Sequence, residues 1–405
     1  MESGKGKPNR KKTPLNNPIE VATTIWFQSN VYPQQPQLHL YELTTQIPRR
    51  WTVYEPMVLL PTGSFDGIIW KQIFLNLSDD QVGALWTQIL AEISKRTGGV
   101  KLTHLAVNEG IPATHHSDLS DERTQGDSDI SEERKPEENI LRSPTGLRML
   151  QGDFGSASID NTAPDFEQAF WVSTRQNGVF QTWTPRWTMF SRGNIKEKAR
   201  LLDFHDNRTI SLDDAWAIDL YAGIGYFTFS YAKLGMRVLC WELNPWSVEG
   251  LRRGAKRNGW SVKVVKDEYD LALPMKKLVS GGEQIIVFLE DNKHAVRRIK
   301  ELEDLNILHV NCGLLPSSDA SWKDVWDIAA SNKSEEAWLH LHENVGVADI
   351  EKRKEEIEQY FEGLMREDGG HKTAHVEHTE LVKTFAPGVR HCVFDLHINK
   401  STSIT

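Results

Sequence analysis

Blocks of apolar residues alternate with polar turns through the second half of the chain, and the clearest block covers residues 216–245. It contains two short apolar runs separated by a glycine-containing turn and a stretch of helical length. Short apolar runs bounded by glycine or an acid are typical of buried strands in a parallel sheet. The block therefore predicts strand, turn, helix, strand and acid, with strands at 217–220 and 238–241, turn glycines Gly223 and Gly225, and the acid Glu242.

This turn indicates a nucleotide-like ligand. Glycines let the backbone approach the ligand, and a carboxylate at the tip of the next strand is placed for ribose hydroxyls. A pyrophosphate site would carry a third glycine, but that position holds Thr228, and Asp219 before the turn would repel phosphate. The pattern favours a phosphate-free, cationic adenosyl ligand, S-adenosylmethionine. An ordinary strand-to-helix turn and, less favoured, NAD stay open as alternatives.

The strands that follow place further candidates at the same edge of the sheet. Apolar runs at 285–289 and 308–314 end in polar or turn residues, and residues after such strand ends face ligands in open α/β sheets. We expect Asp291 to accept a hydrogen bond from the adenine amino group and the reacting base to lie near Pro316. Between the second and third strands, we expect residues 261–283 to be an irregular excursion.

The end of the chain predicts a change in strand direction. Two apolar strands at 376–384 and 391–398 are joined by a short Ala-Pro-Gly turn, after a long helix that begins near Asp349. A hairpin after an alternating pattern implies antiparallel pairing at one edge of a mostly parallel sheet. We therefore predict an α/β, class I methyltransferase-like (Rossmann-like) fold with an antiparallel C-terminal hairpin.

The first half of the chain predicts a smaller α/β region. Residues 80–94 have apolar side chains at helical spacing, and Asn177-Gly178 lies between two strand-like runs, a strong hairpin signal. We expect a disordered basic tail over 1–18, an N-terminal region over 19–205 and the cofactor-binding domain over 206–400.

The net charge of −9 at first argues against a nucleic-acid partner. However, residues 111–139 hold nine acidic and three basic residues, which supply six of the nine excess negative charges. This Ser-rich, apolar-poor stretch predicts a disordered acidic insertion. Without it, the chain is nearly neutral and leaves room for local basic surfaces.

Other residue types limit the class of protein. The three cysteines are widely spaced, which predicts no disulfide framework and a reducing cytoplasm or nucleus, and the histidines lack metal-ligand spacing. No apolar run is long enough to span a bilayer. We expect a cytoplasmic monomer with no metal and no membrane association.

Two groups of basic residues are candidates for binding anionic groups. Arg192, Lys198 and Arg200 precede the first strand and are suited to a cofactor carboxylate or a substrate phosphate, with a solvated connector as the alternative. Candidates for an RNA backbone, with a solvated surface as the alternative, are Arg252, Arg253, Arg257, Arg297 and Arg298.

Five motifs in order give the chain a family resemblance over residue 141 to the end. Together they resemble the tRNA wybutosine-synthesizing protein 2 family, and Val382-Lys383-x-x-Ala386-Pro387 with His391 also matches the related tRNA guanosine-37 N1-methyltransferases. The motifs are Asp219-x-Tyr221-Ala-Gly-Ile-Gly-Tyr-Phe227, Glu242-x-Asn244-Pro245, Met189-Phe-Ser-Arg-Gly-Asn-x-x-Glu197-Lys198, Asn311-x-Gly-Leu-Leu-Pro-Ser-Ser318 with Trp322, and Leu339-His-x-His-x-Asn344-Val.

The resemblance implies transfer of the 3-amino-3-carboxypropyl group of S-adenosylmethionine to C7 of 4-demethylwyosine at position 37 of tRNA-Phe. It assigns tRNA recognition to residues 19–205. Candidates for catalysis are Arg192, Lys198, Pro316 and His342, and His340 or His342 is expected to orient the amino-acid arm. Cofactor-binding candidates are Ser191, Lys198, Asp219, Tyr221, Gly223, Gly225, Glu242, Asn244, Asp291 and Asn292.

Two alternatives to this function stay open. The first is N1-methylation of guanosine 37; Glu242, where the methyltransferases tend to carry Asp, and the Gly-Leu-Leu-Pro-Ser-Ser sequence favour the wybutosine enzyme. The second is a non-catalytic RNA-binding protein, against which the intact Asp219, Gly223, Gly225 and Glu242 argue.

Overall fold

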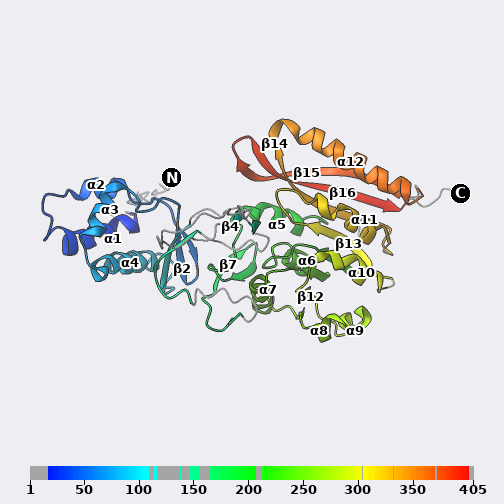
Figure 1. The fold of residues 1–405 in the computed structure, drawn as a ribbon, viewed down its shortest axis with the longest axis horizontal. Helices are drawn as coiled ribbons and strands as arrows, with labels where there is room; N and C mark the ends of the chain where they lie inside the picture. Colours follow the sequence, from blue (N-terminus) through cyan, green and yellow to red (C-terminus); the bar gives the residue numbers. More distant parts are fainter. Residues whose placement is uncertain are drawn as a thin grey trace, which may run out of the picture. The chain divides into compact units, whose positions relative to one another are not determined.

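The computed structural model describes residues 17–108, 114–115, 137–138, 146–155, 164–206, 212, 214–302, 304–331, 333–369 and 372–400. The chain divides into two compact units (Figure 1). One unit comprises residues up to 112 together with 145–154, and the other comprises residues 113–144 and 155–405.

The first unit is a four-stranded sheet with helices. Its strand order is β1-β2-β3-β6, in which β2 and β3 are parallel and the outer pairs are antiparallel. The capping box between Ser78 and Gln81 starts α4, which buries Leu85, Trp86 and Ile89 as its helical spacing predicted. The elements are α1 (Pro18–Trp26), η1 (Phe27–Val31), α2 (Leu40–Thr45), β1 (Thr52–Tyr54), β2 (Met57–Leu60), α3 (Ile68–Leu75), α4 (Asp79–Ser94), β3 (His104–Asn108) and β6 (Leu147–Gln151).

The second unit is built on an eight-stranded sheet in the order β11-β12-β10-β9-β13-β14-β16-β15. The six strands from β11 to β14 are parallel, β16 pairs antiparallel with β14, and β15 pairs antiparallel with β16, so the predicted fold class is confirmed. The strands are β9 (Ala215–Asp219), β10 (Arg237–Trp241), β11 (Val262–Val265), β12 (Ile285–Phe288), β13 (Asn306–Cys312), β14 (Glu336–Gly346), β15 (Lys372–Ala386) and β16 (Val389–Lys400).

Helices cover both faces of this sheet, because successive strand residues point alternately into two cores. Ile218 and Leu239 pack in one core with α9 to α12, whereas Ala217 and Val238 pack in the other with α5 to α7. The helices are η2 (Arg192–Asn194), α5 (Ile195–Leu202), α6 (Thr228–Lys233), α7 (Pro245–Arg257), α8 (Glu268–Leu271), α9 (Met275–Val279), η3 (Asn292–His294), α10 (Ala295–Lys300), η4 (Asp319–Ser321), α11 (Trp322–Ser331), η5 (Val347–Asp349) and α12 (Ile350–Glu367).

The predicted hairpin at Asn177-Gly178 is confirmed. Strands β7 (Val172–Gln176) and β8 (Val179–Trp183) pair antiparallel, and both turn residues have positive φ, 50° and 78°. The hairpin lies in the second unit, where β8 packs on α7. It therefore belongs with the large sheet, although its residues fall inside the predicted 19–205 region.

The expectation of an irregular excursion over 261–283 is wrong. This segment contains β11, α8 and α9, and β11 pairs parallel with β12 at the edge of the sheet. Lys263 lies within the apolar run and Lys266 ends it, as is common on edge strands. The run is therefore too short and too polar to be predicted as a strand from apolar residues alone.

Two predicted disordered segments fall largely outside the described residues. Residues 1–16 of the basic tail are among these, and Pro18 begins α1. Within the acidic insertion, only β4 (Thr114–His115) and β5 (Glu137–Glu138) are described, and they pair antiparallel.

Candidate functional site

The second unit contains a cavity of about 520 Å³ at the carboxyl edge of its sheet. Neighbouring strands β9 and β13 lead to crossovers on opposite sides there, and open α/β sheets bind ligands at such a point. The volume lies within the usual range for small-molecule sites. The lining residues are Met189, Ser191, Asn194, Leu220, Tyr221, Gly223, Ile224, Tyr226, Phe227, Trp241, Glu242, Leu243, Ser247, Glu290, Asn292, Gly313, Leu314, Leu315, Lys383 and Phe385.

The glycine turn between β9 and α6 needs glycine at both positions. Gly223 and Gly225 have φ values of 54° and 87°, which strain other residues. A Cβ on Gly223 would also lie 2.8 Å from the Tyr226 ring, and one on Gly225 would lie 2.6 Å from the Phe229 ring. Gly223 lines the cavity, whereas Gly225 does not and instead lets the turn pack on Phe229.

Asp219 holds the turn from beneath. Its buried carboxylate accepts hydrogen bonds from the Thr228 nitrogen at 3.1 Å and hydroxyl at 2.8 Å, and from Asn311 Nδ2 at 3.0 Å. Burial raises the pKa of Asp219, against the lowering effect of these hydrogen bonds. Asp219 does not line the cavity, so its contribution to ligand binding acts through the shape of the turn.

Glu242 faces the cavity from the tip of β10. Its Oε2 accepts a hydrogen bond from the Gly223 nitrogen at 2.8 Å, and its Oε1 accepts one from the Asn244 nitrogen at 2.8 Å. Burial raises its pKa, whereas the backbone donors lower it. Each carboxylate oxygen can accept a further hydrogen bond, which suits ribose hydroxyls.

Some of the other residues predicted to bind the cofactor line the cavity, and others lie beneath its wall. Ser191, Tyr221 and Asn292 line the cavity, and Asn292 Nδ2 donates to the Leu220 carbonyl at 3.0 Å. Asn244 is buried beneath the wall, where its Oδ1 accepts from the Trp246 nitrogen at 2.9 Å and caps α7.

Glu290 lines the cavity after β12, whereas Asp291 does not. The Asp291 carboxylate accepts from the backbone nitrogen of Lys293 at 3.0 Å and pairs with the Lys293 ammonium at 3.2 Å. Glu290 accepts from Trp241 Nε1 at 3.1 Å and pairs with the buried Arg298. Glu290 and Asn292, which flank the predicted Asp291 in the sequence, are thus the residues that a ligand in the cavity can contact.

Lys198 lies outside this cavity, in the buried space between the hairpin and α6. Its Nζ donates to Gln176 Oε1 and Gln181 Oε1, both at 2.6 Å, and lies 5.7 Å from the centre of the Tyr226 ring. Burial lowers its pKa to about 7. Arg192 is exposed on η2 and does not line the cavity.

The histidine candidates are buried within the sheet. His340 Nδ1 lies 2.7 Å from Asp395 Oδ1, and its Nε2 lies 2.8 Å from His309 Nδ1. His342 Nδ1 lies 2.9 Å from His391 Nε2, and its ring packs on Phe227, which lines the cavity. Neither His340 nor His342 lines the cavity itself.

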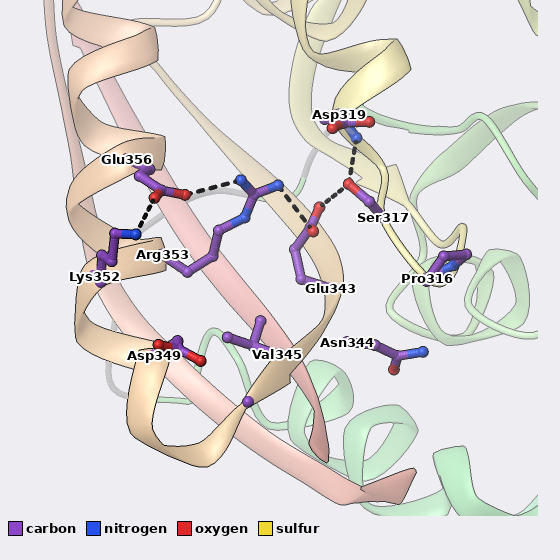
Figure 2. Close-up of a pocket in the computed structure, with 11 residues that line it drawn as sticks. Pro316, Ser317, Asp319, Glu343, Asn344, Val345, Asp349, Lys352, Arg353 and Glu356 are labelled. Carbon is purple, nitrogen blue, oxygen red and sulfur yellow. Dashed lines mark hydrogen bonds and ion pairs between the residues drawn. The ribbon is translucent and has the colours of Figure 1, made fainter. Parts of the chain in front are cut away.

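Pro316 lines a second cavity, of about 330 Å³, between β14 and α12 (Figure 2). Glu343 is central to it: the carboxylate accepts from the Ser317 hydroxyl at 3.0 Å and pairs with Arg353 at 3.1 Å. The Asn344 nitrogen donates to the Pro316 carbonyl at 2.7 Å. These bonds hold the loop after β13, which presents Leu315 to the larger cavity.

The arginines predicted to contact RNA differ in their exposure and in how many partners they already have within the protein. Arg252 and Arg253 pair with Glu249, Arg257 lies over the Phe180 ring, and Arg298 is 3% exposed and pairs with Glu290. Arg297 is exposed on α10. Buried Arg298 is therefore tied to the cavity wall, and Arg297 keeps the accessible position that phosphate binding needs.

Several lining residues were missed by the sequence analysis. Lys383 appeared only as part of a C-terminal motif, and Tyr226, Leu243 and Phe385 were not singled out. The exposed fractions of Leu243 and Phe385, 43% and 59%, are large for apolar side chains and mark the cavity mouth. Only the folding of β15 beside η2 brings Lys383 to this wall.

The wall fits S-adenosylmethionine in three respects: side-chain-free backbone at Gly223, a carboxylate at Glu242, and the Lys383 ammonium. Within the described ranges, no cluster of His, Cys, Asp or Glu is placed to hold a metal ion. None of the described helices combines the length and apolar character needed to cross a membrane.

Comparisons with known proteins identify the family. No family model matches the chain. A Schizosaccharomyces pombe protein named tRNA wybutosine-synthesizing protein 2 is 39% identical over 352 residues, which cover 86% of this chain and 72% of that protein. Its namesake from Saccharomyces cerevisiae is 35% identical over 408 residues, with coverage of 90% and 77%.

A solved structure shares the fold. Pyrococcus horikoshii TYW2, crystallised in complex with MeSAdo, is similar over 91% of this chain and 98% of that chain, with a TM-score of 0.53 and 16% identity. At this identity, the likeness shows the fold alone. The identity to the two yeast proteins over most of both chains shows that this chain belongs to the tRNA wybutosine-synthesizing protein 2 family.

Proposed function

We propose that this chain transfers the 3-amino-3-carboxypropyl group of S-adenosylmethionine to C7 of 4-demethylwyosine at position 37 of tRNA-Phe, and that methylthioadenosine is released. Membership of the family supports a transferase of tRNA wybutosine synthesis that uses S-adenosylmethionine as co-substrate. The observation that carries the proposal is the cavity at the carboxyl edge of the sheet, where Glu242 and the glycine turn form one wall.

In this proposal, the chain's own residues bind and orient. Glu242 accepts hydrogen bonds from the ribose hydroxyls, and Asp219 holds the conformation of the glycine turn. The residues after β12 contact the adenine. The sulfonium of S-adenosylmethionine activates each attached carbon, so orientation within the cavity decides which group is transferred.

The tRNA needs contacts beyond its target base. Arg297, Arg252, Arg253 and Arg257 are the proposed phosphate contacts, and Arg298 is excluded from this role by its burial. Electrostatic binding of this kind weakens steeply with salt. We expect the affinity for tRNA to fall by an order of magnitude or more between about 50 and 200 mM salt.

We also propose tRNA-Phe as the substrate and a monomer in the cytoplasm as the acting form. Cys240, Cys312 and Cys392 are free, which suits a reducing compartment. Light scattering coupled to size-exclusion chromatography tests the monomer, and fractionation tests the compartment.

Product analysis tests the reaction. The purified chain is incubated with tRNA-Phe that carries 4-demethylwyosine and with S-adenosylmethionine labelled in the aminocarboxypropyl arm. Label in the tRNA base together with methylthioadenosine is the expected result. With tRNA-Phe that carries guanosine at position 37 as a parallel substrate, label only in S-adenosylhomocysteine or homocysteine, together with N1-methylguanosine in the tRNA, would overturn the proposal and favour guanosine-37 N1-methylation.

A second measurement separates an enzyme from a non-catalytic RNA-binding protein. We expect saturable binding of S-adenosylmethionine in calorimetry. In cells without this chain, mass spectrometry of tRNA-Phe nucleosides should show accumulated 4-demethylwyosine. Tight tRNA binding with no uptake of S-adenosylmethionine would point to the RNA-binding role instead.

A further inference from the structure

Lys383 places an ammonium group in the wall of the larger cavity. It lies on β15, and its Nζ donates to the Ser191 hydroxyl at 3.0 Å, although the two residues are 192 positions apart in the chain. The contact between β15 and η2 therefore joins the C-terminal hairpin to the segment before α5.

Gly193 keeps this ammonium in position. A Cβ on Gly193 would lie 2.5 Å from Lys383 Cδ and 3.2 Å from its Nζ. The lysine stem therefore packs directly against η2, and any side chain at position 193 would force this stem to shift.

The ammonium has no anion beside it. Across the part of the chain that the structure describes, none of the ion pairs found involves Lys383. It is half-buried, and burial lowers its pKa. The neighbouring His391 adds no second positive charge, because burial and Lys383 lower its pKa to about 4 and keep it neutral. A partly desolvated cation in this setting favours an anionic ligand.

The charges of the cavity leave one place for a carboxylate. Glu242 and Glu290 line the adenosyl part, where a second carboxylate would be repelled. Among the lining residues, the lysine at position 383 carries the positive charge. The Ser191 hydroxyl accepts from Lys383 Nζ at 3.0 Å and donates to Asn194 Oδ1 at 3.2 Å, so it can donate to the same anion once it turns from Asn194.

We propose that Lys383 and Ser191 bind the carboxylate of the aminocarboxypropyl arm, and that this anchor fixes the orientation of the arm in the cavity. The inference rests on the proposed function, because it takes S-adenosylmethionine as the ligand. It adds a positioning residue on β15 to a site whose other walls come from the ends of β9, β10, β12 and β13, the segment around η2, and α7.

Calorimetry with three ligands tests the anchor. The ligands are S-adenosylmethionine, its decarboxylated form and methylthioadenosine, which lacks the arm. We expect the wild-type chain to bind S-adenosylmethionine roughly 10- to 100-fold more tightly than the decarboxylated form, as a charged hydrogen bond predicts. In Lys383→Met, this ratio should fall to about 1, and the affinity for methylthioadenosine should stay within about 2-fold.

Three further variants make the test specific. Lys383→Arg keeps the charge and should retain much of the ratio. Gly193→Ala leaves the lysine in the sequence but displaces its stem, so it should lower the ratio as Lys383→Met does. Lys323→Met, at an exposed lysine on α11, is the matched control and should change nothing.

Each other outcome counts against the anchor. An unchanged ratio in both Lys383→Met and Gly193→Ala overturns it, and equal loss for all three ligands indicates a packing role. Reduced tRNA affinity with an unchanged ratio indicates a phosphate contact. A wild-type chain that transfers methyl groups would instead contradict the proposed function, and the ratio would still report on Lys383.

Discussion

Glu242 Oε2 accepts a hydrogen bond from the backbone nitrogen of Gly223 at 2.8 Å. This bond joins the tip of β10 to the turn after β9, in the wall of the larger cavity. The same carboxylate that is available to a ligand also holds the turn on which the ligand would lie. Loss of Glu242 should therefore affect binding both directly and through the turn.

We predict that Glu242→Ala lowers the affinity for methylthioadenosine roughly 10- to 100-fold, because two ribose hydroxyls lose a charged acceptor. Methylthioadenosine is the probe because it contains the ribose without the amino-acid arm. Calorimetry measures the change. An affinity within a factor of two of wild type would contradict a ribose-binding role for Glu242.

Asp291→Asn tests the adenine contact that the sequence predicted. The Asp291 side chain pairs with Lys293 and does not line the cavity, so we expect this variant to bind methylthioadenosine within about 2-fold of wild type. The measurement is the same calorimetric titration. A tenfold loss would restore Asp291 as the adenine acceptor.

Arg298 and Arg297 are adjacent on α10 but should respond in opposite ways. Arg298 Nη2 donates to Glu290 Oε2 at 2.8 Å in a buried pair, so Arg298→Met should cost about 3 to 5 kcal/mol of unfolding free energy. Arg297→Met should leave stability within about 0.5 kcal/mol and weaken tRNA binding. Urea unfolding and filter binding measure the two effects; equal stability losses would contradict the assignment.

Lys198 should make stability rise with pH. Burial lowers its folded-state pKa to about 7 from 10.5, so between these values the unfolded chain binds a proton that the folded chain does not. Raising the pH from 7 to 10 should therefore increase the unfolding free energy by about 3 kcal/mol relative to Lys198→Met. The difference between the two urea-unfolding series isolates this group from others that titrate.

Lys196→Met on the same helix is the control for that series. Lys196 is exposed, so the pH dependence of this variant should match wild type. Parallel curves for wild type and Lys198→Met would show that the Lys198 ammonium is stabilised by its two glutamine partners.

His391 should make the fold sensitive to acid. Its folded-state pKa is lowered from 6.5 to about 4, mainly by burial and also by Lys383. Between these pH values, the unfolded chain binds a proton at His391 that the folded chain does not bind. Stability present above pH 6.5 is therefore lost as the pH falls towards 4. At pH 5 the loss should be about 2 kcal/mol, and His391→Asn should remove it.

His375→Asn provides the comparison for the acid series. His375 is exposed on β15, paired across the hairpin with β16, so its replacement should leave the acid sensitivity intact. Urea unfolding at pH 7 and pH 5 measures both variants. Equal acid sensitivity in wild type and His391→Asn would contradict the assignment.

Local patterns were sufficient for much of the fold. Apolar alternation predicted the parallel strands and the terminal hairpin, because each strand's two faces must pack into a core on either side of the sheet. The strand β11 was missed, because lysines divide its short apolar run. Glu290 was also passed over in favour of Asp291, since which of two adjacent carboxylates turns inward depends on the start of η3 and on the Arg298 pair.

The sequence by itself determined the glycine turn, the acid after β10 and the family, because these depend on residues that are close together in the chain. Only the tertiary structure decided that Lys383 meets Ser191, that Arg298 is occupied by Glu290, and that His342 and His391 form a buried pair. The Lys383 and His391 contacts arise because β15 and β16 extend the sheet from β14 and meet distant segments, whereas Arg298 meets Glu290, eight residues before it, through the turn between β12 and α10. Side-chain partners of this kind are set by packing in three dimensions, which no local periodicity encodes.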